Sequence, residues 1–125
     1  MYKDCKFVEA SKLFADALNR FEAAGNSVGI VSAGVMLGYC YQRLRRYREA
    51  VRAYESATGL PPPQPIDTWL LALQSLGYCQ AKLKNFSSAT ETFVRLSQIC
   101  KENGKHDGSA RALTTLANIL LDWVE

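Results

Sequence analysis

The chain repeats a short element after about forty residues, a spacing that predicts an elongated array of similar units. The tetrapeptide Leu-Gly-Tyr-Cys begins at Leu37 and again at Leu76, thirty-nine residues later. A related element, Leu-Ala-Asn-Ile, begins at Leu116 after forty more residues. Because each unit of such an array packs mainly on its neighbours, this internal repeat restricts the fold more than any other feature of the chain.

A second element precedes the first copy of the first element and also follows the first and the second copy. It reads KFVEASKLFADA from Lys6, RYREAVRAYESA from Arg46 and NFSSATETFVRL from Asn85, and the three copies align without gaps. Each copy has an aromatic residue, an alanine three residues later and a second aromatic residue four residues after that. Such spacings place side chains on one face of an α-helix. The second element therefore predicts three amphipathic helices.

Small residues recur at fixed positions in both elements. They are Ala10, Ala50 and Ala89 in the second element, and Gly38, Gly77 and Ala117 in the first. Larger side chains at these positions would hold neighbouring helices apart, whereas the nearby aromatic residues can fill the remaining space. We interpret these positions as the packed core of a helical array.

The periodic segments and the residues between them predict an all-α fold of about six helices. The expected helices span about 3–24, 27–44, 47–58, 67–83, 86–102 and 108–124. The expected left-handed C-caps are Gly25, Gly59 and Gly104, and the expected N-caps are Asn26 or Ser27, Asp67 and Asp107. The proline-rich segment 61–65 cannot be helical and must form the longest connection.

Composition argues against several classes of protein. The hydrophobic content of 48% is typical of a soluble fold, and no apolar run approaches the roughly eighteen residues that span a membrane. The first residues lack the apolar stretch of a secretory signal, so we expect a cytoplasmic or nuclear protein without a membrane partner. The formal charge of +3 falls short of a polyanion-binding composition.

The chain shows no motif for catalysis, a metal or a cofactor, and we expect none of the three. Its four cysteines lack the C-x-x-C spacing, and His106 is the only histidine. Phosphate-binding glycine motifs are absent as well. Cys40 and Cys79 share one repeat position with Ile119, which favours buried thiols over reactive ones.

The two elements together resemble the tetratricopeptide repeat. In the best-matching unit, the residues that agree with this motif are Leu37, Gly38, Tyr41, Tyr47, Ala50, Tyr54, Ala57 and Pro62. The next unit keeps Leu76, Gly77, Phe86, Ala89 and Phe93 but has Gln80 and Leu96 instead of the tyrosine and the second alanine. Gly34, Leu73 and Leu113 replace the motif's early tryptophan. The resemblance implies a right-handed solenoid of antiparallel helix pairs.

The period of 39 to 40 residues is longer than the roughly 34 residues usual for this family. It is similar to the longer repeats of Pins/LGN-type spindle-orientation adaptors and of rapsyn-like scaffolds, as is the stretch ENGKHDGSARALTTLANIL. A period near forty also fits HEAT or armadillo repeats, which remain an alternative. Those folds, however, do not require glycine and alanine at the two spacings found here.

The repeat register organises residues 1–125 as a single domain that begins and ends within a repeat. It contains the second helix of a partial repeat at about 3–24, full repeats at about 27–60 and 66–103, and the first helix of a partial repeat at about 108–124. We interpret the chain as a fragment of a longer array. The last helix would then expose an apolar face made of Leu116, Ile119, Leu120 and Trp123, which suggests a homodimer through the terminal helices as another possibility.

The resemblance also implies that the first helices of the repeats line a concave groove for a peptide or a partner helix. The register places three sets of residues on this face: Ser32, Val35, Tyr39, Gln42 and Arg43; Leu71, Gln74, Tyr78, Ala81 and Lys82; and Arg111, Thr114, Asn118, Leu121 and Asp122. The predicted partner-binding residues are Tyr39, Gln42, Arg43, Gln74, Tyr78, Lys82, Arg111 and Asn118. Amide side chains can pair with a peptide backbone, and cations favour an acidic segment. We therefore predict a scaffold or adaptor that binds protein.

Two other binding modes are less favoured by the sequence. Tetratricopeptide domains that hold a C-terminal carboxylate have lysine and asparagine where this chain has Val35 and Tyr39. Nucleic-acid binding through the basic region Arg43–Arg52 is an alternative, although Glu49 and Glu55 interrupt that region and no repeated base-reading code is evident.

Overall fold

The repeated stripes form helices that pack side by side in two layers. The computed structural model describes residues 2–62 and 65–124, and within them all regular structure is helical. The helices are α1 (Tyr2–Ala24), α2 (Ser27–Arg43), α3 (Tyr47–Thr58), α4 (Asp67–Lys82), α5 (Phe86–Glu102) and α6 (His106–Val124). This arrangement confirms the predicted all-α helical-repeat fold.

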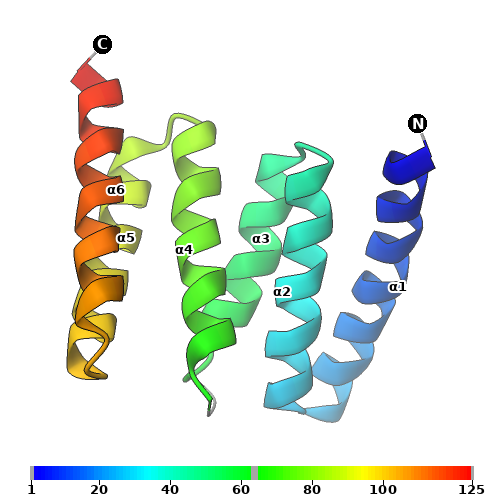
Figure 1. Ribbon diagram of the computed structural model, residues 1–125. Helices are drawn as coiled ribbons and strands as arrows, with labels where there is room; N and C mark the ends of the chain where they lie inside the picture. Colours follow the sequence, from blue (N-terminus) through cyan, green and yellow to red (C-terminus); the bar gives the residue numbers. More distant parts are fainter. Residues whose placement is uncertain (1, 63–64, 125) are drawn as a thin grey trace.

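Successive helices run antiparallel, and each packs against the next along the chain. Figure 1 shows α2, α4 and α6 in the nearer layer, with α3 and α5 behind them and α1 at the far end from α6. The helices α2, α4 and α6 carry the first repeated element, and α1, α3 and α5 carry the second. The first-element helices α2, α4 and α6 therefore form one layer, and these are the helices that were expected to line a binding groove.

Four of the connections share one geometry, which was only partly predicted. Their left-handed residues are Gly25, Arg45, Lys84 and Gly104, with φ between 60° and 72°. In each turn the following N–H donates to the carbonyl five residues earlier, at 2.8–3.0 Å. This Schellman arrangement satisfies carbonyls at the end of the preceding helix. The turns at Arg45 and Lys84 were missed because residues other than glycine rarely adopt this conformation.

Three predicted helix caps were wrong. Gly59 has φ −74° and its N–H still donates to the carbonyl of Glu55, so it continues the helical conformation instead of ending it in a left-handed turn. The N-cap of α4 is Ile66, and Asp67 is already helical. Asp107 lies inside α6, which begins two residues earlier than expected, and a carboxylate in the first turn still interacts favourably with the helix dipole. Asn26, in contrast, caps α2 as predicted by accepting a hydrogen bond from Gly29.

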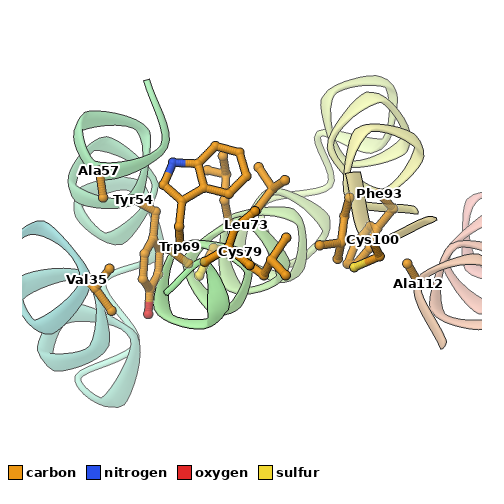
Figure 2. Close-up of a cluster of buried hydrophobic side chains, with 14 of the residues drawn as sticks. Val35, Tyr54, Ala57, Trp69, Leu73, Cys79, Phe93, Cys100 and Ala112 are labelled. Atoms are coloured by element: carbon orange, nitrogen blue, oxygen red, sulfur yellow. The ribbon is translucent and has the colours of Figure 1, made fainter. Parts of the chain in front are cut away.

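The small residues of the first element receive aromatic rings from the second. A Cβ atom built on Gly38 would lie 2.6 Å from the Tyr54 ring, and one built on Gly77 would lie 2.5 Å from the Phe93 ring. Both aromatic residues are almost completely buried. Figure 2 shows Tyr54 and Phe93 in the same core cluster as Trp69. Close approach of α2 to α3, and of α4 to α5, therefore depends on the absence of a side chain at these glycines.

The cysteines in the first-element helices belong to this core. Cys40 and Cys79 are buried, as their shared repeat position predicted. Burial raises the pKa of the Cys79 thiol to about 11, so this thiol stays protonated at neutral pH. Both residues therefore contribute as small apolar groups, and no catalytic role needs to be assigned to them.

Candidate protein-binding surface

The exposed side of α2, α4 and α6 carries most of the residues predicted to bind a partner. Seven of the eight are exposed: Tyr39, Arg43, Gln74, Tyr78, Lys82, Arg111 and Asn118. The two tyrosines keep 46% and 42% of their surface in water, although large aromatic side chains are usually buried. Val35, which the register also placed on this face, is instead buried in the core.

Two neighbouring cavities lie between α4 and α6. The first, of about 660 Å³, lies beside the start of α6, and its lining includes Gln74 and Arg111. The second, of about 670 Å³, includes Tyr78, Lys82 and Asn118 in its lining. Thr115 lines both cavities, so they adjoin along α6. Five predicted binding residues thus border one hollowed strip, which we call the α4–α6 groove.

The lining of the α4–α6 groove carries charges of both signs: Lys105 and Arg111 with Asp67 and Asp107 in the first cavity, and Lys82 and Lys84 with Asp122 in the second. Among the described residues, no ion pair joins Lys82 or Arg111 to a carboxylate. The Lys82 ammonium lies 5.3 Å from the centroid of the Tyr78 ring, within the range of a cation–π interaction. Asp122 lines the same cavity as Lys82. Near the other cavity, Asp67 forms a 2.9 Å ion pair with Lys105 across the start of α4 and the α5–α6 turn.

The α2 end of the surface is organised differently because α1 contributes Phe7. The Phe7 ring meets the Tyr39 ring edge-on, with 6.0 Å between their centroids. The Arg43 guanidinium lies 5.8 Å from the centroid of the same phenyl ring. Tyr39 and Arg43 are therefore held in place while remaining exposed. Phe7 is the first aromatic residue of the second-element copy that begins at Lys6 and was therefore expected in the core, so its contact with Tyr39 was not predicted.

Gln42 has a structural partner that sequence reasoning missed. The Tyr54 hydroxyl donates to the Gln42 Oε1 atom at 2.9 Å. Burial raises the pKa of Tyr54 to about 12, so this hydroxyl keeps its proton and remains a donor at neutral pH. One acceptor of Gln42 is thus engaged with the core, whereas its amide group can still donate to a ligand. Gln42 is therefore a weaker candidate than Gln74.

No group of three or more histidine, cysteine, aspartate or glutamate side chains among the described residues could hold a metal ion. His106 begins α6 and lines the first cavity as an exposed side chain. None of the helices between residues 2 and 62 or between 65 and 124 is sufficiently long and apolar to cross a membrane.

Comparison with known proteins agrees with this geometry over part of the chain. Residues 33–64 match the family model of the tetratricopeptide repeat, and this segment contains most of α2 and all of α3. No curated protein and no solved structure matches the chain. The match supports a tetratricopeptide repeat, and the long-period subtype related to Pins/LGN or rapsyn stays a prediction.

Proposed function

We propose that the chain is a cytoplasmic scaffold or adaptor domain that binds an acidic segment of a partner protein along α2, α4 and α6. The tetratricopeptide match at residues 33–64 supports a protein-interaction module in general. The observation that carries the specific proposal is the α4–α6 groove, in which predicted binding residues from two repeats border adjoining cavities.

The groove combines groups that an extended acidic peptide can use. Gln74 and Asn118 each offer a donor and an acceptor, which match the two hydrogen-bonding groups of a peptide unit. Tyr78 supplies a large contact surface with few rotatable bonds. Arg111 lines the first cavity and Lys82 lines the second. Acidic side chains spaced along one segment could therefore reach both cations. Lys105 is paired with Asp67, so Lys82, Lys84 and Arg111 are the cations that acidic side chains of a partner would meet.

A comparative pull-down tests this proposal. We expect the triple alanine variant of Tyr39, Tyr78 and Asn118 to lose most of the proteins that the wild-type chain recovers, because it removes exposed contacts from all three first-element helices. The measurement is quantitative mass spectrometry of the recovered proteins. Arg52→Ala, at an exposed position on α3, is the control and should retain them. Undiminished recovery by a folded triple variant would contradict the proposal.

The same experiment addresses the nucleic-acid alternative. The arginines of the α2–α3 region are exposed, which is compatible with a polyanion. They are Arg43, Arg45, Arg46, Arg48 and Arg52. Binding to phosphates would weaken steeply with salt because it releases condensed counterions. Recovery that depends on Arg52 and disappears after nuclease treatment would favour this alternative over the groove.

A further inference from the structure

The space between α4 and α6 differs from the space between α2 and α4, although the repeat places equivalent positions in both. Helices α2 and α4 contact each other directly, whereas two cavities lie between α4 and α6. In the first case, the Tyr54 hydroxyl donates to the Gln42 Oε1 atom at 2.9 Å and also hydrogen-bonds to Ser75. These side chains come from α3, α2 and α4, so they link the three helices.

The equivalent positions of the next unit carry residues that cannot form this link. Ala81 aligns with Gln42, Phe93 aligns with Tyr54, and Thr115 aligns with Ser75. Phenylalanine lacks the hydroxyl and alanine lacks the amide, so the hydrogen bond between tyrosine and glutamine has no equivalent here. Phe93 instead lines the first cavity, Ala81 the second, and Thr115 both. The α4–α6 groove is therefore open where polar side chains close the preceding space.

One side of α6 faces this groove, and it includes a residue that was expected to be exposed. The predicted exposed face of α6 was partly wrong, because Leu116 and Ile119 are buried in the core. Ile119 also lines the second cavity, four residues after Thr115. Leu120 and Trp123, in contrast, are exposed as expected.

The α5 side of the first cavity is apolar. Phe93, Leu96 and Cys100 line it from α5, and Figure 2 shows Phe93 and Cys100 near Ala112 of α6, which lines it as well. These four residues are buried. Leu71 of α4 lines the same cavity but keeps 57% of its surface in water. Covering this apolar surface with an apolar side chain of a partner would stabilise a complex.

Charge distinguishes the two cavities. Two lysine or arginine cations and two carboxylates line the first cavity, and one pair of them, Asp67 and Lys105, forms an ion pair of 2.9 Å. The second cavity is lined by Lys82 and Lys84 and, among the described residues, by a single carboxylate, that of Asp122. An acidic side chain is therefore attracted more strongly to the second cavity, and the balanced charge of the first favours an uncharged one.

The position of the cavities along the helices sets the spacing of the side chains that can occupy both. On α4, Leu71 of the first cavity precedes Tyr78 and Lys82 of the second by seven and eleven residues. With a rise of about 1.5 Å per helical residue, these offsets correspond to about 10–17 Å. An extended segment covers this distance in about three to five residues, at about 3.3 Å each.

On the premise that the partner segment binds in the α4–α6 groove, as proposed above, we propose that it combines a large apolar residue with an acidic residue about three to five positions away. The apolar side chain, of the size of leucine or methionine, enters the first cavity and packs against Leu71 and Phe93. The carboxylate lies beside Lys82 in the second cavity. Acidic segments that lack the apolar residue therefore bind weakly.

A random peptide library displayed on phage and selected on the 125-residue chain tests the spacing. We expect the enriched peptides to share a large apolar residue and an aspartate or glutamate at the proposed spacing, in either order along the peptide. Enriched peptides without the apolar residue, or without a fixed spacing, would contradict the proposal. Failure to recover any peptide would overturn it as well.

A second test narrows the groove from within the chain. Ala81→Gln combined with Phe93→Tyr gives α4 and α5 the residues that link α2 to α3. Fluorescence anisotropy of a labelled enriched peptide should show binding weakened by at least about tenfold, because the new side chains occupy space that the peptide's apolar residue needs. Leu71→Ser, at an exposed position, should weaken binding in the same way, whereas Val94→Ser, an exposed control on α5, should bind like wild type. Circular dichroism melts verify that all variants are folded.

Matched changes in the peptide show which contact is lost. Serine in place of the peptide's apolar residue should weaken binding to wild type by at least about tenfold but should weaken binding to Leu71→Ser much less. An amide in place of its acidic residue should likewise have little effect on Lys82→Gln. Equal effects of the serine peptide on wild type and on both cavity variants would overturn the apolar contact, while continued dependence on Lys82 would leave the proposed function intact. Independence from Lys82 and Arg111 as well would overturn the proposed function itself.

Discussion

Replacing Trp69 with alanine is expected to lower the free energy of unfolding by about 3–5 kcal/mol, the range for a fully buried aromatic side chain. Trp69 has no exposed surface and lies in the main core cluster (Figure 2). Its indole N–H donates to the carbonyl of Leu60 at 3.1 Å, and the Arg95 guanidinium lies 5.2 Å from the ring centroid. Alanine would leave a cavity and an unpaired carbonyl at the connection between α3 and α4.

Trp123→Ala provides the matched control because the chain has two tryptophans. Trp123 is 48% exposed and stacks on Phe86, so its loss should cost only about 0.5–1.5 kcal/mol. Urea denaturation followed by far-ultraviolet circular dichroism measures both variants without relying on tryptophan fluorescence. Equal losses in the free energy of unfolding would show that the buried Trp69 contributes no more to stability than the half-exposed Trp123.

Overpacking is expected to have the second largest effect on stability. Ala50→Leu and Ala89→Leu should each lower the free energy of unfolding by about 1–3 kcal/mol, because a larger side chain must displace a neighbouring helix. Both alanines have no exposed surface and occupy the same position in α3 and α5. Thermal melts measure the change. Ala23→Leu, at an exposed position in α1, should have little effect, and unchanged melting of both core variants would mean that the repeat register is misplaced.

Helix positions were predictable because local and repeated signals agree. The stripes at spacings of three and four residues define α3 and α5 with the bounds that the structure has. Glycine and alanine at two fixed positions correctly indicated close packing, as the contacts of Gly38 and Gly77 demonstrate. These features depend on residues near one another in sequence, so a single sequence contains the necessary information.

Features set by tertiary context were less predictable. The left-handed turns at Arg45 and Lys84 carry long basic side chains where glycine would normally signal the conformation. The orientation of α6 also escaped prediction, because Leu116 and Leu120 lie four residues apart on a helix that is apolar on several sides. Only the position of α5 determines that Leu116 is buried while Leu120 stays 39% exposed.

The candidate binding surface was also predicted only in part from the sequence. The repeat register placed Tyr78, Lys82 and Asn118 on one face, and the structure brings them to one cavity. It could not foresee that Gln42 accepts a hydrogen bond from Tyr54, since this contact depends on the packing of α3 against α2. The role of Thr115 between the cavities was missed for a similar reason, because the register alone does not show which residues join two hollows.

An acidic partner segment is proposed to bind across the first-element helices α2, α4 and α6. Calorimetric titration of the segment recovered by pull-down, against single alanine variants, tests it most directly. We predict that Arg43→Ala, Lys82→Ala and Arg111→Ala each weaken binding by about 0.5–2 kcal/mol, with the larger losses where the contact excludes water. Arg52→Ala on α3 should bind like wild type, and melts should show that all four variants are folded. Wild-type affinity in all three variants, Arg43→Ala, Lys82→Ala and Arg111→Ala, would contradict binding across the first-element helices.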